Sequence, residues 1–237
     1  MSPADEAVVA MLRRYETSAT AAAPLGVLLD LLANPEAPTS VHEEERARDV
    51  HIADSLAGLE IAELKQARLI ADLGSGAGLP GLVLAAALPD TRLVLVEAAR
   101  RKCDFLRSAV AAMGLGNAEV VWARAEEWAE GIGRCDVVCA RALAALPVLC
   151  EYAAPLLRER GILVAWKGAV SEAEATDARA AGAHLGLAAD EVRPVVPFAG
   201  SGRRALHVIR KVAPTPANYP RRPGMATKRP LSAKNPR

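Results

Sequence analysis

Apolar residues change their spacing along the chain near Gln66. Within the first 35 residues they recur at the three- and four-residue intervals of a helix, and Pro24 and Pro35 interrupt the pattern. A second helical pattern begins at residue 43 and ends near Gly58. Residues 1–66 are therefore predicted to form an N-terminal helical appendage.

After Gln66, short runs rich in β-branched and aliphatic residues alternate with longer helical stretches. The expected strands cover residues 68–73, 92–98, 118–123, 135–142, 161–168 and 205–212, and the expected helices cover 79–88, 99–114, 145–159 and 171–185. Strands that alternate with such helices imply right-handed crossovers and a mainly parallel sheet covered on both faces. We therefore predict a doubly wound α/β domain over residues 67–212, whose ligand binds at the carboxyl ends of the strands.

The segment DLGSGAGLPG, residues 72–81, follows the first expected strand and holds four glycines. Gly76, Gly78 and Gly81 satisfy the GxGxxG pattern between a strand and a helix, and Glu97 ends the next expected strand. A dinucleotide and S-adenosylmethionine both need such a tight turn, together with an acidic residue for the ribose hydroxyls. A glycine turn with a purely structural role is the third interpretation.

Three features favour S-adenosylmethionine over a dinucleotide. Asp72 at the strand tip, shortly before Gly74, would repel a pyrophosphate and attract the ammonium group of S-adenosylmethionine. After the third expected strand, the backbone of Ala125 and the carboxylate of Glu126 can hydrogen-bond an adenine edge, unless Glu126 is an ordinary exposed carboxylate. No part of the chain resembles a second, substrate-binding dehydrogenase domain. The predicted cofactor is S-adenosylmethionine.

Three more ionisable residues lie near the predicted site. Arg141, at the tip of the fourth strand, is expected to contact the donor or the target nucleotide, with a salt bridge to Asp136 or Glu126 as the structural alternative. His51 and Asp54 lie three residues apart on an expected helix and so share one face of it. They are predicted to pair with each other and to brace this helix against the α/β domain.

The charges are distributed unevenly, although the net charge is only +1. Residues 203–237 hold ten of the 29 basic residues and no acidic one, which leaves 19 basic against 28 acidic side chains before them. Such an end is typical of polyanion binding, because Lys and Arg neutralise phosphates; a merely solvated tail is the alternative. Prolines forbid a long helix here, so residues 213–237 are predicted to form an extended basic arm. The expected RNA-binding residues are Lys167, at the end of the fifth strand, and Arg221, Arg222, Lys228 and Arg229 in the arm.

The composition is that of a protein that folds alone and stays in the cytoplasm. The chain has 237 residues, 51% of them hydrophobic, and no apolar run long enough to span a membrane. Its N-terminus lacks the basic region and apolar core of a signal peptide. The four cysteines form no CxxC pair and no Cys/His ligand spacing, which predicts buried, reduced thiols and no metal site. We expect a soluble monomer without a membrane partner.

Seven short segments stand out by their order along the chain: HIADSL, DLGSGAGLPGLVLA, VEAARRKCDFL, RAEE, ARALA, WKG and YPRRPGMATKRPL. In this order they resemble the bacterial 16S ribosomal RNA guanine-N7 methyltransferases, the RsmG family. The resemblance implies a Rossmann-like class I methyltransferase fold with a mainly parallel, seven-stranded sheet. It also implies S-adenosylmethionine as donor, and a guanine of the 16S ribosomal RNA in the small ribosomal subunit as acceptor. By position it assigns donor binding to Gly74, Leu79, Glu97, Ala98, Ala99, Ala125, Glu126 and Arg141.

The residues around the fourth strand fit methylation of guanine N7. Methylation of an exocyclic amine typically uses an NPPY-like tetrapeptide after this strand, and methylation of a pyrimidine carbon needs a cysteine nucleophile. The sequence here is CARALA, and Cys139 has neither a proline nor a base beside it. Guanine N7 has a free lone pair and no proton to lose, so proximity and orientation suffice. The alternatives are methylation of another RNA or of a small molecule, a non-enzymatic RNA-binding module, and a NAD-binding oxidoreductase.

Overall fold

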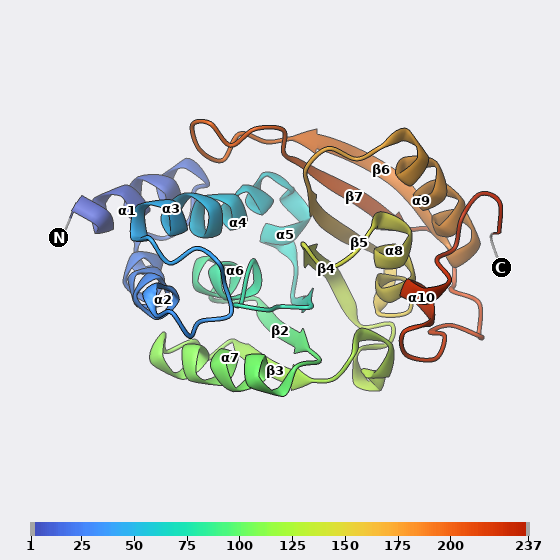
Figure 1. Cartoon of the computed structure of the whole chain (residues 1–237), viewed down its shortest axis with the longest axis horizontal. Coiled ribbons are helices and arrows are strands. Elements are labelled where there is room, and N and C mark those ends of the chain that lie inside the picture. Colours follow the sequence, from blue (N-terminus) through green and yellow to red (C-terminus); the bar gives the residue numbers. More distant parts are fainter. Residues whose placement is uncertain (1–2, 236–237) are drawn as a thin grey trace.

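The computed structural model describes residues 3–235 and places a single twisted sheet at the centre of the molecule (Figure 1). Its strands are β1 (Leu69–Leu73), β2 (Arg92–Glu97), β3 (Ala118–Trp122), β4 (Cys135–Arg141), β5 (Leu157–Lys167), β6 (Leu187–Pro194) and β7 (Ala205–Lys211). They lie in the order β3-β2-β1-β4-β5-β7-β6. The first five in this order are parallel, and β7 is antiparallel to both of its neighbours. The predicted mainly parallel, seven-stranded sheet is confirmed.

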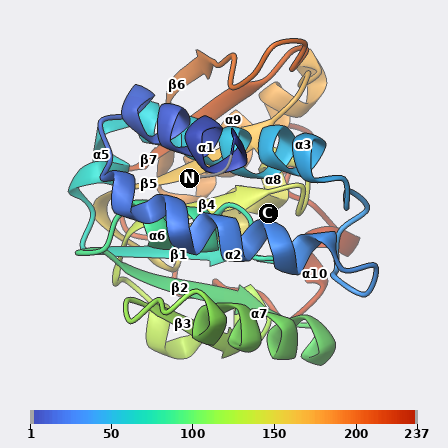
Figure 2. The ribbon, with the colours of Figure 1, turned by 90° about the vertical axis from the view of Figure 1, so that its left-hand side faces the viewer.

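Helices cover both faces of this sheet. They are α1 (Pro3–Arg14), α2 (Ala22–Ala33), α3 (Glu44–Ala47), α4 (Asp54–Leu56), α5 (Ala62–Gln66), α6 (Gly81–Ala87), α7 (Arg100–Ala112), α8 (Leu146–Ala153), α9 (Glu172–Leu185) and α10 (Met225–Lys228). One apolar core joins α1 and α2 to α6, α7 and the sheet, for example through Leu12, Leu25 and Leu82. The other core, on the opposite face, holds α8 and α9 through residues such as Leu149 and Leu185. Figure 2 shows α1 and α2 in front of the sheet, on the side of α6.

The N-terminal helices therefore contribute to the same apolar core as the helices of the α/β unit, because the leucines of α2 face that core at helical spacing. No helix within residues 3–235 is long and apolar enough to cross a membrane.

The order in which successive strands are added to the sheet reverses at β1. From β1 the chain proceeds to β2 on one side, whereas β4 lies on the other side of β1, with Asp72 opposite Cys139. In open α/β sheets such a switch point leaves a crevice outside the carboxyl ends of the strands. Asp72, Glu97, Arg141 and Lys167 stand in or beside the last positions of four of these parallel strands.

One strand, β6, is absent from the expected elements. It lies at the edge of the sheet and pairs only with β7. The sequence LAADEVRP carries little apolar alternation, and Val192, one of its large apolar side chains, is 59% exposed. Pairing with β7 forms this strand, and charged residues are common on such edges.

The C-terminal segment is not the extended arm that was predicted. It contains the short helix α10, which lies beside α8 (Figure 1). Tyr219, Ala226 and Leu231 are all buried, and Tyr219 and Leu231 belong to the core that holds α8 and α9. The prolines prevent a long helix here, but these three apolar side chains anchor the segment to the body of the protein.

Candidate active site

Asp72 closes the turn that follows β1. Its Oδ2 atom accepts a hydrogen bond from the Gly81 amide at 3.0 Å, and its backbone carbonyl accepts one from the Ser75 hydroxyl at 2.9 Å. Its Oδ1 atom is buried and has no partner among the described residues. Burial raises the pKa of Asp72 to about 7. Because Oδ1 has no partner within residues 3–235, it can accept a hydrogen bond from a ligand or pair with a cationic one.

The glycine loop adopts a backbone that only glycine tolerates well. Gly74, Gly76 and Gly78 have φ values of +65°, +58° and +87°. The Gly76 amide donates to Glu97 Oε2 at 3.0 Å, and the Ala99 amide donates to Glu97 Oε1 at 2.8 Å. Glu97 thus ties the loop to the segment after β2.

Three other predicted donor-site residues lie in the glycine loop or directly after Glu97 in the chain. Leu79 is buried, and its amide donates to the Ser75 carbonyl at 3.1 Å. Ala98 and Ala99 are exposed, and the carbonyl of Ala98 accepts a hydrogen bond from Trp122 Nε1 at 3.0 Å. The two alanines therefore have open surface at the tip of β2.

Glu126 lies in a short 3-10 turn, Ala125–Glu127, just after β3. Its Oε1 atom accepts a hydrogen bond from the Gly224 amide at 2.9 Å. The C-terminal segment therefore touches the turn that was expected to bind adenine. The sequence gives no sign of this contact, because the two residues are 98 positions apart.

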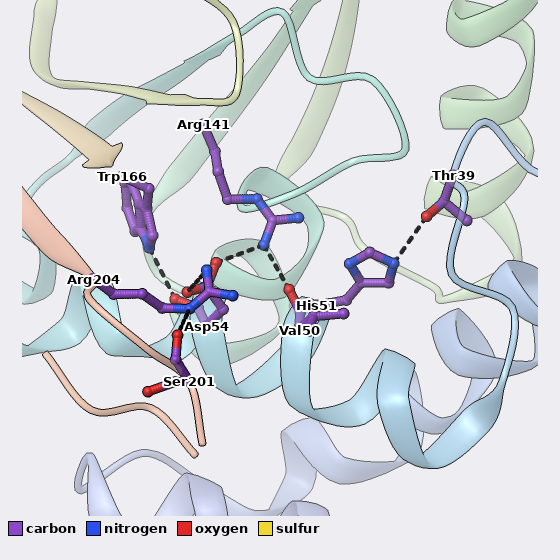
Figure 3. Close-up of polar contacts among 8 residues, drawn as sticks. All are labelled: Thr39, Val50, His51, Asp54, Arg141, Trp166, Ser201 and Arg204. Atoms are coloured by element: carbon purple, nitrogen blue, oxygen red, sulfur yellow. Dashed lines mark hydrogen bonds and ion pairs between the residues drawn. The ribbon is translucent and has the colours of Figure 1, made fainter. Parts of the chain in front are cut away.

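A buried carboxylate joins β4 to two distant segments (Figure 3). Asp54 is 2% exposed, and its two oxygens pair with Arg141 at 2.9 Å and with Arg204 at 3.0 Å. Arg141 also donates to the Val50 carbonyl at 2.9 Å, and the Asp54 carbonyl accepts a hydrogen bond from Trp166 Nε1 at 2.8 Å. The structure thus pairs Arg141 with Asp54 rather than with Asp136 or Glu126.

The predicted pair between His51 and Asp54 is wrong. His51 Nε2 instead lies 2.9 Å from the Thr39 hydroxyl, on the side away from Asp54 (Figure 3). Residues Arg48–Ala53 form a π-helical turn, which takes more residues per turn than an α-helix. Residues three apart therefore no longer share one face, and each finds a different partner.

A cavity of about 490 Å³ opens between these residues and the ends of β4 and β5. Its lining includes His51, Asp54, Arg141, Ala142, Trp166, Lys167 and Arg204. Lys167 also pairs with Glu174 at 2.9 Å. Burial, and then the charge of Arg141, lower the pKa of His51 to about 4, so this ring is neutral at physiological pH. Cavities of this size accept a small molecule or a single nucleotide unit.

The cavity and the glycine loop are neighbours. Residues that follow β4 separate them: Ala142 lines the cavity, and the Leu143 side chain packs against Gly74, where an added Cβ would come within 2.6 Å of it. Ala142 has a φ of +54°, a strained conformation for a residue with a side chain. This strained residue lies between the glycine loop and the cavity.

The four basic residues of the C-terminal segment that were expected to bind RNA differ in their environment. Arg221 pairs with Glu151, which is 1% exposed, and this places Arg221 in a structural contact. Arg222, Lys228 and Arg229 are exposed, and we call them the exposed tail cations. Arg210 and Lys211, the last two residues of β7, pair with Glu63 and with the Ala154 carbonyl, respectively.

None of the cysteines is placed to act as a nucleophile at this site. Cys139 is fully buried in β4, and burial raises the pKa of its thiol well above the usual range. All four cysteines are buried and free. Within residues 3–235, no three His, Cys, Asp or Glu side chains gather as metal ligands would.

A model of the family described as rRNA small subunit methyltransferase G matches residues 31–197. The chain belongs to this family. The family member from Pelotomaculum thermopropionicum is 41% identical over 197 residues, which cover 81% of this chain and 82% of that protein. The member from Deinococcus radiodurans is 44% identical over 197 residues, covering 81% of this chain and 78% of its own. The resemblance noted in the sequence is confirmed.

The fold agrees with solved methyltransferase-like structures. Fibrillarin from Aeropyrum pernix, which holds bound S-adenosyl-L-methionine, matches with a TM-score of 0.52 at 19% identity, over 66% of this chain and 72% of its own. Members of the rRNA small subunit methyltransferase G family use the same donor, and the residues here fit it. The unpartnered Asp72 oxygen suits a cationic group, and the open backbone at Gly76 leaves space beside it, with the nearest heavy atom 3.7 Å from an added Cβ.

Proposed function

We propose that this protein transfers a methyl group from S-adenosylmethionine to N7 of a guanine in 16S ribosomal RNA of the small ribosomal subunit. The observation that carries the proposal is the pairing of an acidic, glycine-lined turn with a basic cavity that holds no poised base. Family membership supports the same reaction, because its relatives are named as ribosomal RNA small subunit methyltransferases.

The donor side is assigned to the turn after β1 and the ends of β2 and β3. Asp72 offers its free oxygen to the amino-acid end of the donor, and Gly74, Gly76 and Gly78 leave their backbone open to it. Glu97 is assigned to accept hydrogen bonds from ribose hydroxyls, and Leu79 of the glycine loop and Ala98 and Ala99 after β2 are assigned as further donor contacts. Ala125 and Glu126 are placed for the adenine edge.

The bound donor supplies a methyl group activated by a sulfonium. The N7 lone pair of guanine forms the new bond to the methyl carbon while the carbon–sulfur bond breaks, its electron pair stays on sulfur, and the positive charge moves to the guanine. No proton leaves N7, so this chain needs to bind and orient rather than to supply a base. The high pKa of the Cys139 thiol, raised by burial, agrees with such a mechanism.

The acceptor side is assigned to the cavity. Arg141 stands at its boundary with the donor side and is held there by Asp54. Lys167 lines the same cavity and can meet a phosphate beside the target base. The exposed tail cations are candidates for further phosphate contacts. Arg221 was also expected to bind RNA, but its pairing with Glu151 favours a structural role.

The proposal is tested with purified protein, methyl-labelled S-adenosylmethionine and small ribosomal subunits from cells that lack the protein. We expect the label to enter 16S RNA and to appear as N7-methylguanosine after digestion to nucleosides. Label in another nucleoside, or in small molecules only, would contradict the proposed acceptor. Subunits from cells that contain the protein serve as the control and should accept little label.

A further inference from the structure

One nitrogen of His51 has no hydrogen-bond partner among the described residues, although the residue is only 7% exposed. This atom is Nδ1, and the ring lines the cavity of about 490 Å³. Figure 3 shows the ring between Thr39 and Arg141, with Nε2 turned toward Thr39 and the other nitrogen on the side of Arg141. A buried polar atom without a partner is costly, so a ligand that supplies the partner would bind favourably.

The contacts of Thr39 favour one of the two neutral tautomers of His51. The Thr39 oxygen already accepts a hydrogen bond from the Val41 amide at 3.2 Å, and its own hydrogen has His51 Nε2 as an acceptor at 2.9 Å. If Nε2 accepts, the proton of a neutral imidazole must reside on Nδ1. His51 therefore presents an N–H donor to the cavity.

The surroundings of this donor suit a nucleotide. Arg141, Arg204 and Lys167 line the same cavity, and Asp54 is the acidic residue among its lining side chains. The excess of positive charge favours the phosphate of a nucleotide whose base enters the cavity, and enzymes that modify bases in RNA commonly take the base out of the stack in this way. Ala142 lines this cavity, and the next residue, Leu143, packs on Gly74 of the glycine loop. The cavity therefore lies next to the proposed donor site.

We propose that His51 selects guanine at this site by donating a hydrogen bond from Nδ1 to guanine O6. This inference rests on the proposed function. On the edge that carries N7, guanine presents two acceptors, N7 and O6, whereas adenine presents N7 and an amino donor. When guanine is bound, an N–H donor that faces O6 has an acceptor. When adenine is bound, the same donor faces the amino group, which is another donor, and is left without a partner. Because O6 is adjacent to N7, the same bond also helps to set the direction of N7.

The test replaces the target guanine of reconstituted small subunits with 2-aminopurine, which keeps N7 and the ring shape but lacks O6. With wild-type protein, kcat/KM should fall by roughly tenfold, the cost of leaving one buried donor without its acceptor. His51→Phe should lower kcat/KM on guanine by a similar factor and should show no further loss with 2-aminopurine. His51→Asn, whose side-chain amide can replace the N–H, should recover part of the preference for guanine.

Two controls separate this role from a general loss of structure. The affinity of each variant for S-adenosylmethionine, measured by calorimetry, should equal that of the wild type. His42→Phe is the matched variant, because His42 is bonded to the Leu32 carbonyl at 2.9 Å and lies outside the residues that line the cavity. It should keep the full preference for guanine over 2-aminopurine.

Equal methylation of guanine and 2-aminopurine by the wild type would overturn the inference, whether or not any variant folds. A His51→Phe protein as sensitive to O6 as the wild type would overturn it as well. Failure of the wild type to methylate N7 in unmodified subunits would contradict the proposed function itself, and this reaction is measured first.

Discussion

Arg221→Ala is expected to loosen the C-terminal segment by leaving a carboxylate buried without its partner. The guanidinium of Arg221 forms a bidentate ion pair with both oxygens of Glu151, with Nε 2.6 Å from Oε1. It also donates a hydrogen bond to the Arg229 carbonyl at 2.9 Å. The side chain of Glu151 is 1% exposed and that of Arg221 is 17% exposed. The pair is therefore mostly removed from water.

Breaking a buried ion pair by removing one partner costs about 3 to 5 kcal/mol, and the partial exposure of Arg221 places the expected loss in the free energy of unfolding near the lower end, about 3 kcal/mol. A second effect concerns donor binding. The amide of Gly224, three residues after Arg221, donates a hydrogen bond to the Glu126 carboxylate, and loosening of the segment would break this bond. A freed Glu126 side chain must be ordered again when the donor binds, which costs about 1 kcal/mol and weakens donor affinity roughly fivefold.

Urea denaturation measures the first effect, and calorimetric titration with S-adenosylmethionine measures the second. Arg222→Ala is the matched control: it removes the same charge from the neighbouring, exposed position and should change the free energy of unfolding by less than about 0.5 kcal/mol. The double variant Glu151→Leu with Arg221→Met removes both charges and should recover most of the lost stability. Equal stability of the Arg221→Ala and Arg222→Ala proteins would refute the reasoning.

Three further predictions address the chemistry, the donor turn and the RNA contacts. Cys139→Ser should keep methyl transfer within a small factor of the wild type, because N7 methylation needs no nucleophile; complete inactivation of the folded variant, or a covalent RNA adduct, would indicate carbon methylation instead. Asp72, with its pKa raised to about 7 by burial, binds a proton more tightly in the folded than in the unfolded chain. The free energy of unfolding without donor should therefore fall, by about 3 kcal/mol from this group, as the pH rises from about 4 to 7, and Asp72→Asn should lack this decrease in urea titrations across that range. Replacing all three exposed tail cations with alanine should make the slope of log RNA affinity against log salt less negative by about 2, at 0.7 per phosphate contact. Filter-binding assays over a salt series measure this slope, and an unchanged slope would exclude these residues as phosphate ligands.

The fold was predictable where the hydrophobic pattern is strong. Strands β1, β2 and β4 and the second part of β5 are mostly buried apolar runs, and the glycine turn after β1 follows a pattern that indicates a ligand-binding loop. The edge strand β6 was missed because its pairing with β7, rather than its own composition, makes it a strand. Packing of the C-terminal segment was missed for a similar reason: Tyr219 and Leu231 are isolated among polar residues and prolines.

The candidate site was predictable in its local parts and not in its long-range ones. The Asp72 and Glu97 positions follow from the ends of strands, which the sequence marks. The partners of Asp54 lie 87 and 150 residues away, and no local pattern carries that information. The π-helical turn at Arg48–Ala53 also changes which side chains share a face, so the helical spacing of His51 and Asp54 predicted the wrong contact.

The central claim, methylation of a guanine at N7 in 16S ribosomal RNA, is tested most directly by mapping N7-methylguanosine in that RNA from cells with and without this protein. We expect one modified guanine to disappear when the protein is absent and to return when the wild-type chain is supplied. An unchanged map of N7-methylguanosine in cells without the protein would contradict the account.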